Sequence, residues 1–285
     1  MSTESISDSM TQPQITVALP VYNGEQYIAI AIKSVLAQTF SDFELLILDN
    51  CSTDKTLDII RTFSDPRIRL IVNPKNLGMI GNWNLAVSLA AGKYIKILSH
   101  DDLLAPSCLA EQINGFLKYQ NQDIGIVTCK KRIINESGVV VMPGFGLFGF
   151  TRVINGRRAI KKSMRAGRNI IGEPSVVLLD AKLLRASGDF EQPQFTPDIK
   201  MWFKMLKGSN LLFLNKNLAS YRISSTSTST SVASTQGSQF VQLINEVIRT
   251  DSIRVGKFTQ RVGLLRSHLN ARIRKVISRI AALRS

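Results

Sequence analysis

Cysteine, histidine and acidic residues are all scarce in this sequence. Its three cysteines, Cys51, Cys108 and Cys129, are scattered without the spacing of a metal site or a disulfide framework, which is consistent with a reducing compartment. Its two histidines, His100 and His268, have no histidine partner, and no Ser/His/Asp arrangement or P-loop is present. A cysteine-based metal site, a disulfide-stapled fold and a P-loop nucleotide site are therefore not expected.

Long apolar runs are missing as well. No run approaches the length of a membrane-spanning helix, and the N-terminal residues MSTESISDSM are polar and acidic, unlike a secretory signal. We therefore expect a cytoplasmic protein. The 285 residues, 44% hydrophobic and 20% charged, are typical of a soluble protein with one large or two modest domains.

Positive charge is what the sequence has in excess. Lys and Arg number 36 against 21 Asp and Glu, so the formal net charge is +15. This balance fits nucleic acid, an anionic membrane surface or a phosphate-bearing substrate equally well. The excess is greatest after about residue 240, where Glu246 and Asp251 are the only acidic residues and apolar residues recur near helical spacing.

The first half of the chain alternates between short apolar, β-prone runs and segments with helical periodicity. This alternation predicts right-handed βαβ crossovers and therefore a parallel sheet. The expected strands are Ile15–Leu19, Phe43–Leu48, Ile68–Val72, Tyr94–Leu98 and Ile124–Thr128.

The pattern loosens beyond residue 128. We expect a hairpin of Arg132–Ile134 with Val139–Val141, and loops with at most a short helix over residues 142–170. The remaining expected elements are a strand at Ser175–Leu179, a helix at Asp198–Leu206 and a strand at Leu211–Leu214.

Polar residues follow the first four predicted strands. They are Pro20 to Asn23, Asp49 with Asn50, Asn73 to Gly78, and Ser99 to Asp102. In a parallel sheet all of these clusters lie at one edge, where such sheets bind ligands. The pair Asp101 and Asp102 suits a divalent cation carrying phosphate, although Asp also commonly caps a helix, so both interpretations stay open on these residues alone.

At this point the sequence resembles the family 2 glycosyltransferases, over roughly residues 14–222. The segments that carry the resemblance are PVYNGEQYI, SVLAQTFSDFELLILDNCSTDKT, NLGMIGNWN and GKYIKILSHDD, with GEPSVVLL, GDF and TPDIKMW further on. The resemblance implies the GT-A fold: an α/β, Rossmann-like, mostly parallel sheet flanked by helices, here with a C-terminal helical extension. It also implies an inverting transfer from a nucleotide-diphosphate sugar, with UDP the favoured nucleotide, to a glycan or lipid-linked acceptor in surface polysaccharide or glycolipid assembly.

The resemblance further implies roles for particular residues. Asp101 would bind the family's Mg²⁺ or Mn²⁺, and Asp198 would be the catalytic base that deprotonates the acceptor hydroxyl. The residues expected to bind the nucleotide sugar are Pro20, Tyr22, Asn23, Glu25, Asp49, Asn76, Gly78, His100 and Asp102. If Asp198 is only a helix cap, Glu173 and Asp189 are the next candidates for the base.

Two positions depart from the family pattern. Ser99 stands where the first aspartate of the D-x-D motif is usual, and Ser224 stands where many members have a histidine. The first departure motivates an alternative, a nucleotide-sugar-binding homologue with little or no turnover. A nucleic-acid-binding module is a third hypothesis, against which stand the strand-edge carboxylates and the absence of nucleic-acid motifs.

The expected organisation has four parts. These are a disordered lead-in at 1–14, a GT-A domain at 15–225, a Ser/Thr-rich linker at 226–239 and a basic amphipathic helical tail at 240–285. Within the domain, the donor half covers about 15–128 and the acceptor half about 129–225. The tail is expected either to lie on an anionic membrane surface or to pack on the catalytic domain.

Overall fold

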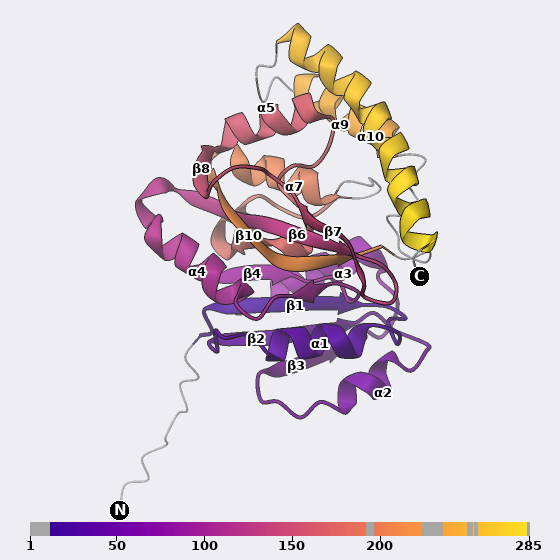
Figure 1. Cartoon of the computed structure of the whole chain (residues 1–285). Helices are drawn as coiled ribbons and strands as arrows, with labels where there is room; N and C mark the ends of the chain where they lie inside the picture. Colours follow the sequence, from indigo (N-terminus) through magenta and orange to yellow (C-terminus); the bar gives the residue numbers. More distant parts are fainter. Residues whose placement is uncertain (1–11, 192–196, 224–235, 250–252, 254–255, 284–285) are drawn as a thin grey trace, which may run out of the picture.

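The architecture of the chain is a large sheet covered by helices on both faces (Figure 1). The computed structural model describes residues 12–191, 197–223, 236–249, 253 and 256–283. Within these residues, ten strands form one sheet in the order β3-β2-β1-β4-β9-β6-β10-β5, with β7 paired to β6 and β8 to β10. The strands are β1 (Ile15–Val21), β2 (Phe43–Asp49), β3 (Ile68–Val72), β4 (Tyr94–Ile97), β5 (Leu103–Leu104), β6 (Ile124–Ile134), β7 (Val140–Phe145), β8 (Arg152–Asn155), β9 (Val177–Asp180) and β10 (Asn210–Arg222).

The helices connect the strands and cover the sheet. They are α1 (Ile28–Leu36), α2 (Thr56–Arg61), α3 (Gly78–Leu89), α4 (Cys108–Lys118), α5 (Gly156–Ala166), α6 (Ala181–Ala186), α7 (Pro197–Leu206), α9 (Gln236–Arg249) and α10 (Lys257–Leu283), with short 3₁₀ turns η1 (Gln120–Gln122) and η2 (Pro174–Val176). None of the helices in the described part of the chain combines the length and the apolarity needed to span a bilayer.

The parallel sheet predicted for the first half is confirmed. β1 pairs in parallel with β2 and β4, and β2 with β3. Every residue of β1 is buried, because helices cover both faces of a parallel sheet. Val21 lies opposite Asp49 in this register, so the two loops that follow β1 and β2 start side by side.

The second half of the sheet is more continuous than the sequence pattern predicts. β6 and β10 are single long strands, whereas the prediction gave β6 as two pieces and β10 only its first part. Polar residues interrupt the apolar pattern of β6. One of them, Lys131, is nevertheless buried and pairs with Glu173, so the strand continues past this residue. The sheet is also mixed, because β9 runs antiparallel to both β4 and β6.

The prediction of loops over residues 142–170 is wrong. The segment contains β7, β8 and the well-formed helix α5. Asn155 caps α5 by accepting a hydrogen bond from the backbone N–H of Arg158, and Gly167 ends it with φ of +63°. The periodicity was hidden because Gly156 and Ser163, which are not apolar, occupy buried positions of the helix.

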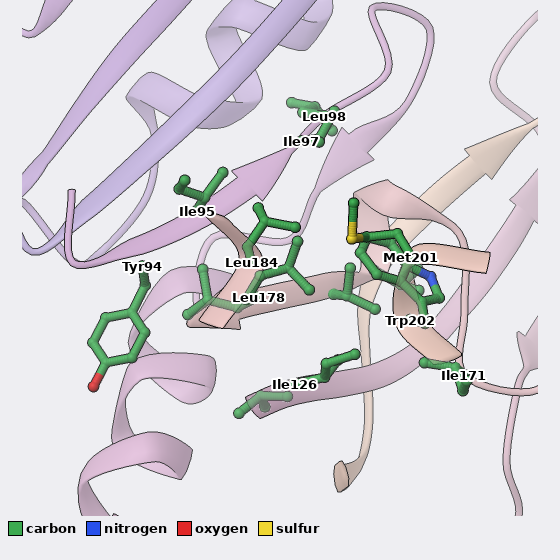
Figure 2. Packing of buried hydrophobic residues seen from close by; sticks show 14 of the residues in the cluster. Tyr94, Ile95, Ile97, Leu98, Ile126, Ile171, Leu178, Leu184, Met201 and Trp202 are labelled. Carbon is green, nitrogen blue, oxygen red and sulfur yellow. The ribbon is translucent and has the colours of Figure 1, made fainter. Parts of the chain in front are cut away.

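The hydrophobic core lies between the sheet and the helices on its faces, and α7 buries a large part of it. Figure 2 shows side chains of β4, β6 and β9 meeting Met201 and Trp202 of α7. Lys96 of β4 is also fully buried, and its Nζ donates to the backbone oxygens of Ser175 (3.0 Å) and Val177 (2.9 Å). Its charge is thus solvated by the peptide carbonyls of the neighbouring segment.

The C-terminal helices pack on the catalytic domain. α9 buries four apolar side chains in the common core: Phe240, Leu243, Ile244 and Val247. α10 lies against α5, and its Gly263 approaches so closely that an added Cβ would sit 2.3 Å from the backbone oxygen of Met164. α9 begins inside the segment predicted as a linker, while residues 226–235 and most of the predicted lead-in lie outside the described residues. The four-part division itself stays a prediction.

Candidate active site

The carboxyl ends of β1 and β2 form the first part of the site. Asp49, the last residue of β2, is only 1% exposed, and its Oδ2 accepts a hydrogen bond from the backbone N–H of Ser52 at 3.1 Å. No donor within the described residues reaches its Oδ1, which is also buried. A buried acceptor without a protein donor fits a ligand that brings an N–H or O–H group, such as a base or a ribose.

The loop after β1 is fastened to the loop after β2. The backbone N–H of Thr53 donates to the side-chain oxygen of Asn23 at 2.8 Å, and the backbone N–H of Lys55 donates to Glu25 at 3.0 Å. Asn23 has φ of +49°, a left-handed conformation that asparagine tolerates better than most residues. Asn23 and Glu25, both predicted to bind the donor, therefore also hold these two loops together.

Asparagine side chains organise the loop after β3. Asn50 donates to Asn76 at 2.8 Å and accepts from Asn73 at 3.0 Å, and Asn73 also donates to Asn82 of α3 at 2.9 Å. Gly78 opens α3 with φ of +71°. The sequence placed Asn76 and Gly78 in the site and Asn50 in a strand-end cluster, but it did not single out Asn82, whose amide helps to hold this loop against the strand ends.

The loop after β4 completes this edge. Asp101 is half-buried, and His100 lies against the loop after β1, since a Cβ on Gly24 would meet the His100 ring at 2.7 Å. Tyr22 is exposed in the same loop, whereas Pro20 is buried within β1. The structure thus brings the residues predicted from four successive strand ends to one edge of the sheet.

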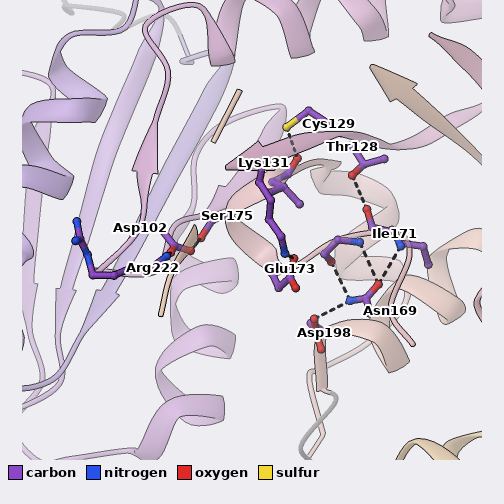
Figure 3. A network of polar contacts seen from close by, with 12 residues as sticks. Asp102, Thr128, Cys129, Lys131, Asn169, Ile171, Glu173, Ser175, Asp198 and Arg222 are labelled. Atoms are coloured by element: carbon purple, nitrogen blue, oxygen red, sulfur yellow. Dashed lines mark hydrogen bonds and ion pairs between the residues drawn. The ribbon is translucent and has the colours of Figure 1, made fainter. Parts of the chain in front are cut away.

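Asp102 differs from its neighbour Asp101, because its carboxylate is 1% exposed and engaged by the protein. Its Oδ2 accepts from the Ser175 hydroxyl at 2.5 Å, and its Oδ1 accepts from the backbone N–H of Arg222 at 2.9 Å (Figure 3). Burial and then the charge of Asp101 raise the pKa of Asp102 well above its usual range. These contacts make Asp102 a link between the loop after β4 and the acceptor half.

The metal predicted at Asp101 can be tested against the residues present. Within the described residues, no group of three or more His, Cys, Asp and Glu side chains could hold a metal ion. A hard cation also accepts phosphate oxygens and water as ligands, so one carboxylate suffices when the ligand supplies a diphosphate. Asp101 fits that arrangement, while Ser99 and the fully engaged Asp102 add no second carboxylate.

Asp198 lies in the first turn of α7, in the half of the chain predicted to bind the acceptor. Its Oδ2 accepts a hydrogen bond from Asn169 Nδ2 at 3.0 Å, and Asn169 Oδ1 accepts from the backbone N–H groups of Ile171 and Gly172, both at 3.0 Å. The Trp202 indole, one helical turn further on, donates to the Gly172 oxygen at 2.9 Å. The carboxylate is therefore held in place while staying only partly buried.

One short segment, residues 169–175, contacts both sides of the site. Asn169 holds Asp198, Glu173 forms an ion pair with Lys131, and Ser175 donates to Asp102 (Figure 3). Ser175 Oγ also accepts from the backbone N–H of Ser99 at 3.2 Å. Of the two other candidates for the base, Glu173 is thus engaged in an ion pair and Asp189 is exposed.

Arg222 is a residue of this region that the sequence did not single out. Its guanidinium is buried over the Tyr27 ring at 4.4 Å and donates to the backbone oxygens of Asp101, Asn135 and Glu136. Arg222 is the last residue of β10 and lies well beyond the strand Leu211–Leu214 that the sequence predicts, so the pattern gave no sign of these contacts. Ser224, two residues later, lies outside the described residues.

Comparison with known proteins agrees with this geometry. Residues 16–172, more than half of the chain, match the model of "Glycosyl transferase family 2". The chain is 31% identical over 217 residues to the UDP-Glc:alpha-D-GlcNAc-diphosphoundecaprenol beta-1,3-glucosyltransferase WfgD of Escherichia coli, which covers 75% of this chain and 79% of the relative. It is also 34% identical over 142 residues to the hyaluronan synthase of Pasteurella multocida, covering 49% of this chain and 14% of that protein. The chain belongs to glycosyltransferase family 2 and is a glycosyltransferase.

Solved structures show the same fold. Staphylococcus aureus TarS (residues 1–349) in complex with UDP-GlcNAc superposes with a TM-score of 0.69 at 18% identity, covering 90% of this chain and 73% of that one. The mannosyltransferase PcManGT of Pyrobaculum calidifontis, in complex with GDP-Man and Mn²⁺, gives 0.65 at 17% identity, covering 95% and 74%. These similarities confirm the expected GT-A fold.

Proposed function

We propose that this glycosyltransferase moves a sugar, with inversion, from a nucleotide-diphosphate sugar to the hydroxyl of a glycan or lipid-linked acceptor. The similar proteins support a nucleotide-sugar donor, because their names and structures include UDP-Glc, UDP-GlcNAc and GDP-Man. A UDP-sugar is the donor we favour. The diphosphoundecaprenol acceptor named for WfgD supports a place in surface polysaccharide or glycolipid assembly, on the cytoplasmic side of the membrane.

The donor would lie along the edge formed by the loops after β1, β2, β3 and β4. Asp49 has a buried oxygen without a donor among the described residues, and Tyr22, which follows the Val21 that pairs with Asp49, offers an exposed ring. Tyr22 would stack on the base, while Asp49 would accept hydrogen bonds from the base or the ribose. Asn23, Glu25, Asn76 and Gly78 would shape the loops around the nucleotide, and His100 would border the diphosphate.

Asp101 would hold a magnesium or manganese ion together with the diphosphate. When bound, this ion would neutralise the negative charge that develops on the leaving nucleoside diphosphate. The chain's own contribution is to fix the Asp101 loop, through the Arg222 side chain on the Asp101 backbone oxygen (2.9 Å) and through Ser175 and Asp102.

Asp198 would act as the general base. One observation carries this assignment: the segment 169–175 forms a hydrogen bond with Asp198 at one end and with Asp102 at the other. The hydrogen bond from Asn169 orients the Asp198 carboxylate, and a carboxylate can accept several hydrogen bonds, including one from an acceptor hydroxyl. Deprotonation of the hydroxyl as it attacks the anomeric carbon gives inversion in a single displacement.

The proposal is tested by a screen of nucleotide sugars against the full-length protein, with and without Mn²⁺. We expect one UDP-sugar to raise the melting temperature in the presence of Mn²⁺, and chelation to remove most of this shift. Product analysis with that donor and a lipid-linked acceptor should then show release of nucleoside diphosphate and an inverted linkage. Donor binding that is unaffected by chelation would contradict the role of the metal, and a retained anomeric configuration would contradict the role of Asp198.

A further inference from the structure

The helix α5, which the sequence pattern hides, presents a purely basic outer face. Its buried side carries Ala159, Ile160, Ser163 and Met164, and all five of its charged residues are exposed cations. These are Arg157, Arg158, Lys161, Lys162 and Arg165. Within the described residues no carboxylate lies within ion-pair distance of any of them. Glu246, on the neighbouring α9, is already paired with Lys200 of α7 at 2.7 Å.

The helix α10 has an inner face of small and polar residues and an outer apolar face. The inner face packs on α5: Gly263 and Ser267 are buried there, and Asn270 donates to the backbone oxygen of Ala166 at 2.8 Å. The outer face carries Phe258, Leu265 and Leu269, which are 66%, 74% and 54% exposed. Their spacing of i, i+7 and i+11 places them in one row along the helix. Packing within the protein therefore explains only the inner face.

The basic face of α5 and the outer row of α10 adjoin one another. The Arg165 guanidinium of α5 lies over the Phe258 ring of α10 at 5.5 Å from its centroid. Figure 1 shows α5 and the first part of α10 at the end of the molecule remote from β2 and β3, with α10 continuing from there along one side. Arg261 and Arg266 flank the exposed row and are exposed themselves.

We propose that the outer faces of α5 and α10 together form a docking surface for an anionic phospholipid bilayer. Exposed leucine and phenylalanine side chains flanked by cations match a bilayer surface, where apolar groups enter the acyl boundary and cations meet phosphate headgroups. A second copy of the chain would oppose these cations with the same cations. A nucleic acid would satisfy the cations but would leave the row of Leu265 and Leu269 without a partner.

The inference goes beyond the proposed reaction, although it explains how a lipid-linked acceptor would reach the enzyme. The sequence alone suggested the tail as the membrane contact. Among the described side chains, the structure places five exposed cations on α5, which the sequence had not linked to the tail, and turns one apolar row of α10 outward. Vesicle binding is measured without donor or acceptor, so its failure would leave the proposed reaction untouched.

The test is flotation of the full-length protein with vesicles of phosphatidylcholine alone or mixed with phosphatidylglycerol. The triple variant Arg157→Gln, Lys161→Gln, Lys162→Gln removes three charges from α5. Its matched control, Lys33→Gln, Arg61→Gln, Lys118→Gln, removes three exposed charges from α1, α2 and α4. A second pair compares Leu265→Ser with Leu117→Ser, an exposed leucine of α4.

We expect binding to the anionic vesicles only. The α5 variant should bind on the order of 100-fold more weakly, since each basic residue near an anionic surface contributes about 1 kcal/mol, or about fivefold. The control triple should change binding much less, and Leu265→Ser should weaken it where Leu117→Ser does not. Equal binding by the α5 variant and wild type, or an equal loss in the control triple, would overturn the proposal. The proposal would also be overturned if the protein did not float with vesicles but bound single-stranded polyuridylate through the α5 cations.

Discussion

The donor half and the acceptor half of the site fix their polar side chains in different ways. In the predicted donor half, polar side chains of the loops after the parallel strands bond to neighbouring loops, either to backbone N–H groups, as Asn23 does to Thr53, or to each other, as Asn73 does to Asn50. In the predicted acceptor half, side chains of β6 and α7 bond to the segment 169–175: Lys131 to Glu173, and Asp198 to Asn169. The donor half is thus an edge built by the sheet itself, whereas the acceptor half is assembled by tertiary packing.

This difference predicts two separable kinds of defect. Changes at the donor edge should alter donor affinity, and changes around Asp198 should alter turnover with donor affinity unchanged. Ser175, which contacts the Asp102 loop from the acceptor half, should affect both.

The largest effect is expected from Asp198→Asn. Loss of the general base should lower kcat by roughly two to four orders of magnitude. Asparagine caps a helix about as well as aspartate, so the melting temperature and the donor Kd should stay unchanged. Steady-state kinetics, calorimetric donor titration and thermal unfolding would measure the three quantities. Asp189→Asn changes the exposed alternative candidate for the base and should behave like wild type if Asp198 is the base. Near-normal turnover in Asp198→Asn would move the base to another residue.

A smaller effect is expected from Asp101→Asn at the donor edge. Without its carboxylate the loop should lose the ion that binds the diphosphate, so the donor Kd in Mn²⁺ should rise at least about tenfold and no longer respond to chelation. Ser99→Asp should bind the donor at least as tightly as wild type. Titrations of the donor with and without a chelator provide the measurement, with Asp58→Asn on the exposed side of α2 as the control. A Kd that still depends on Mn²⁺ in Asp101→Asn would place the ion elsewhere.

Ser175→Ala tests the link between the halves. The change removes the hydroxyl that donates to Asp102 and accepts from the Ser99 backbone, leaving two groups without their partner. An unsatisfied buried group costs about 1–3 kcal/mol, so the free energy of unfolding should fall by about that amount. Donor affinity and turnover should both decline, because the Asp101 loop and the segment 169–175 lose a shared contact.

The control for Ser175→Ala is Ser163→Ala. Ser163 is equally buried and donates to the Arg168 backbone oxygen at 2.8 Å, but it lies in α5 and contacts no donor loop. Urea denaturation and donor titration of both variants separate a loss of stability from a loss of the Ser175 contact between the two halves. If Ser163→Ala weakens the donor as much as Ser175→Ala does, the link we assign to Ser175 is not specific.

The same division explains what the sequence could predict. The donor edge could be predicted from a local pattern, the alternation of strands and helices with polar residues at the strand ends. Asp49, Asn76 and Asp101 lie where this pattern predicts them. The division of labour between Asp101 and Asp102 was not predictable, because it depends on Ser175 and Arg222, both far away in the sequence. Likewise, α5 was not predicted, because its buried face includes Ser163 and its many cations obscure the helical spacing of its apolar residues.

The smallest effect is expected from Glu191→Gln, which tests whether ion pairing stabilises the acceptor half. Glu191 bonds Lys200 at 2.7 Å and also pairs with Lys204, both on α7. The hydrogen bonds from Lys200 and then Lys204 hold the pKa of Glu191 below its usual value. Because the group is partly exposed, its contribution should be at most about 1 kcal/mol.

A carboxyl whose pKa is lowered by folding stabilises the protein above its unfolded pKa of about 4.3, and this stabilisation is lost as the pH falls through the folded value. Urea denaturation should therefore show wild type more stable than Glu191→Gln near neutral pH, with the difference shrinking as the pH falls below about 4.3 and with added salt narrowing it at neutral pH. Glu111→Gln, which breaks the single exposed pair with Lys216, should cost less. A deficit in Glu191→Gln that is as large in acid as at neutral pH would show that packing, not charge, is what Glu191 contributes.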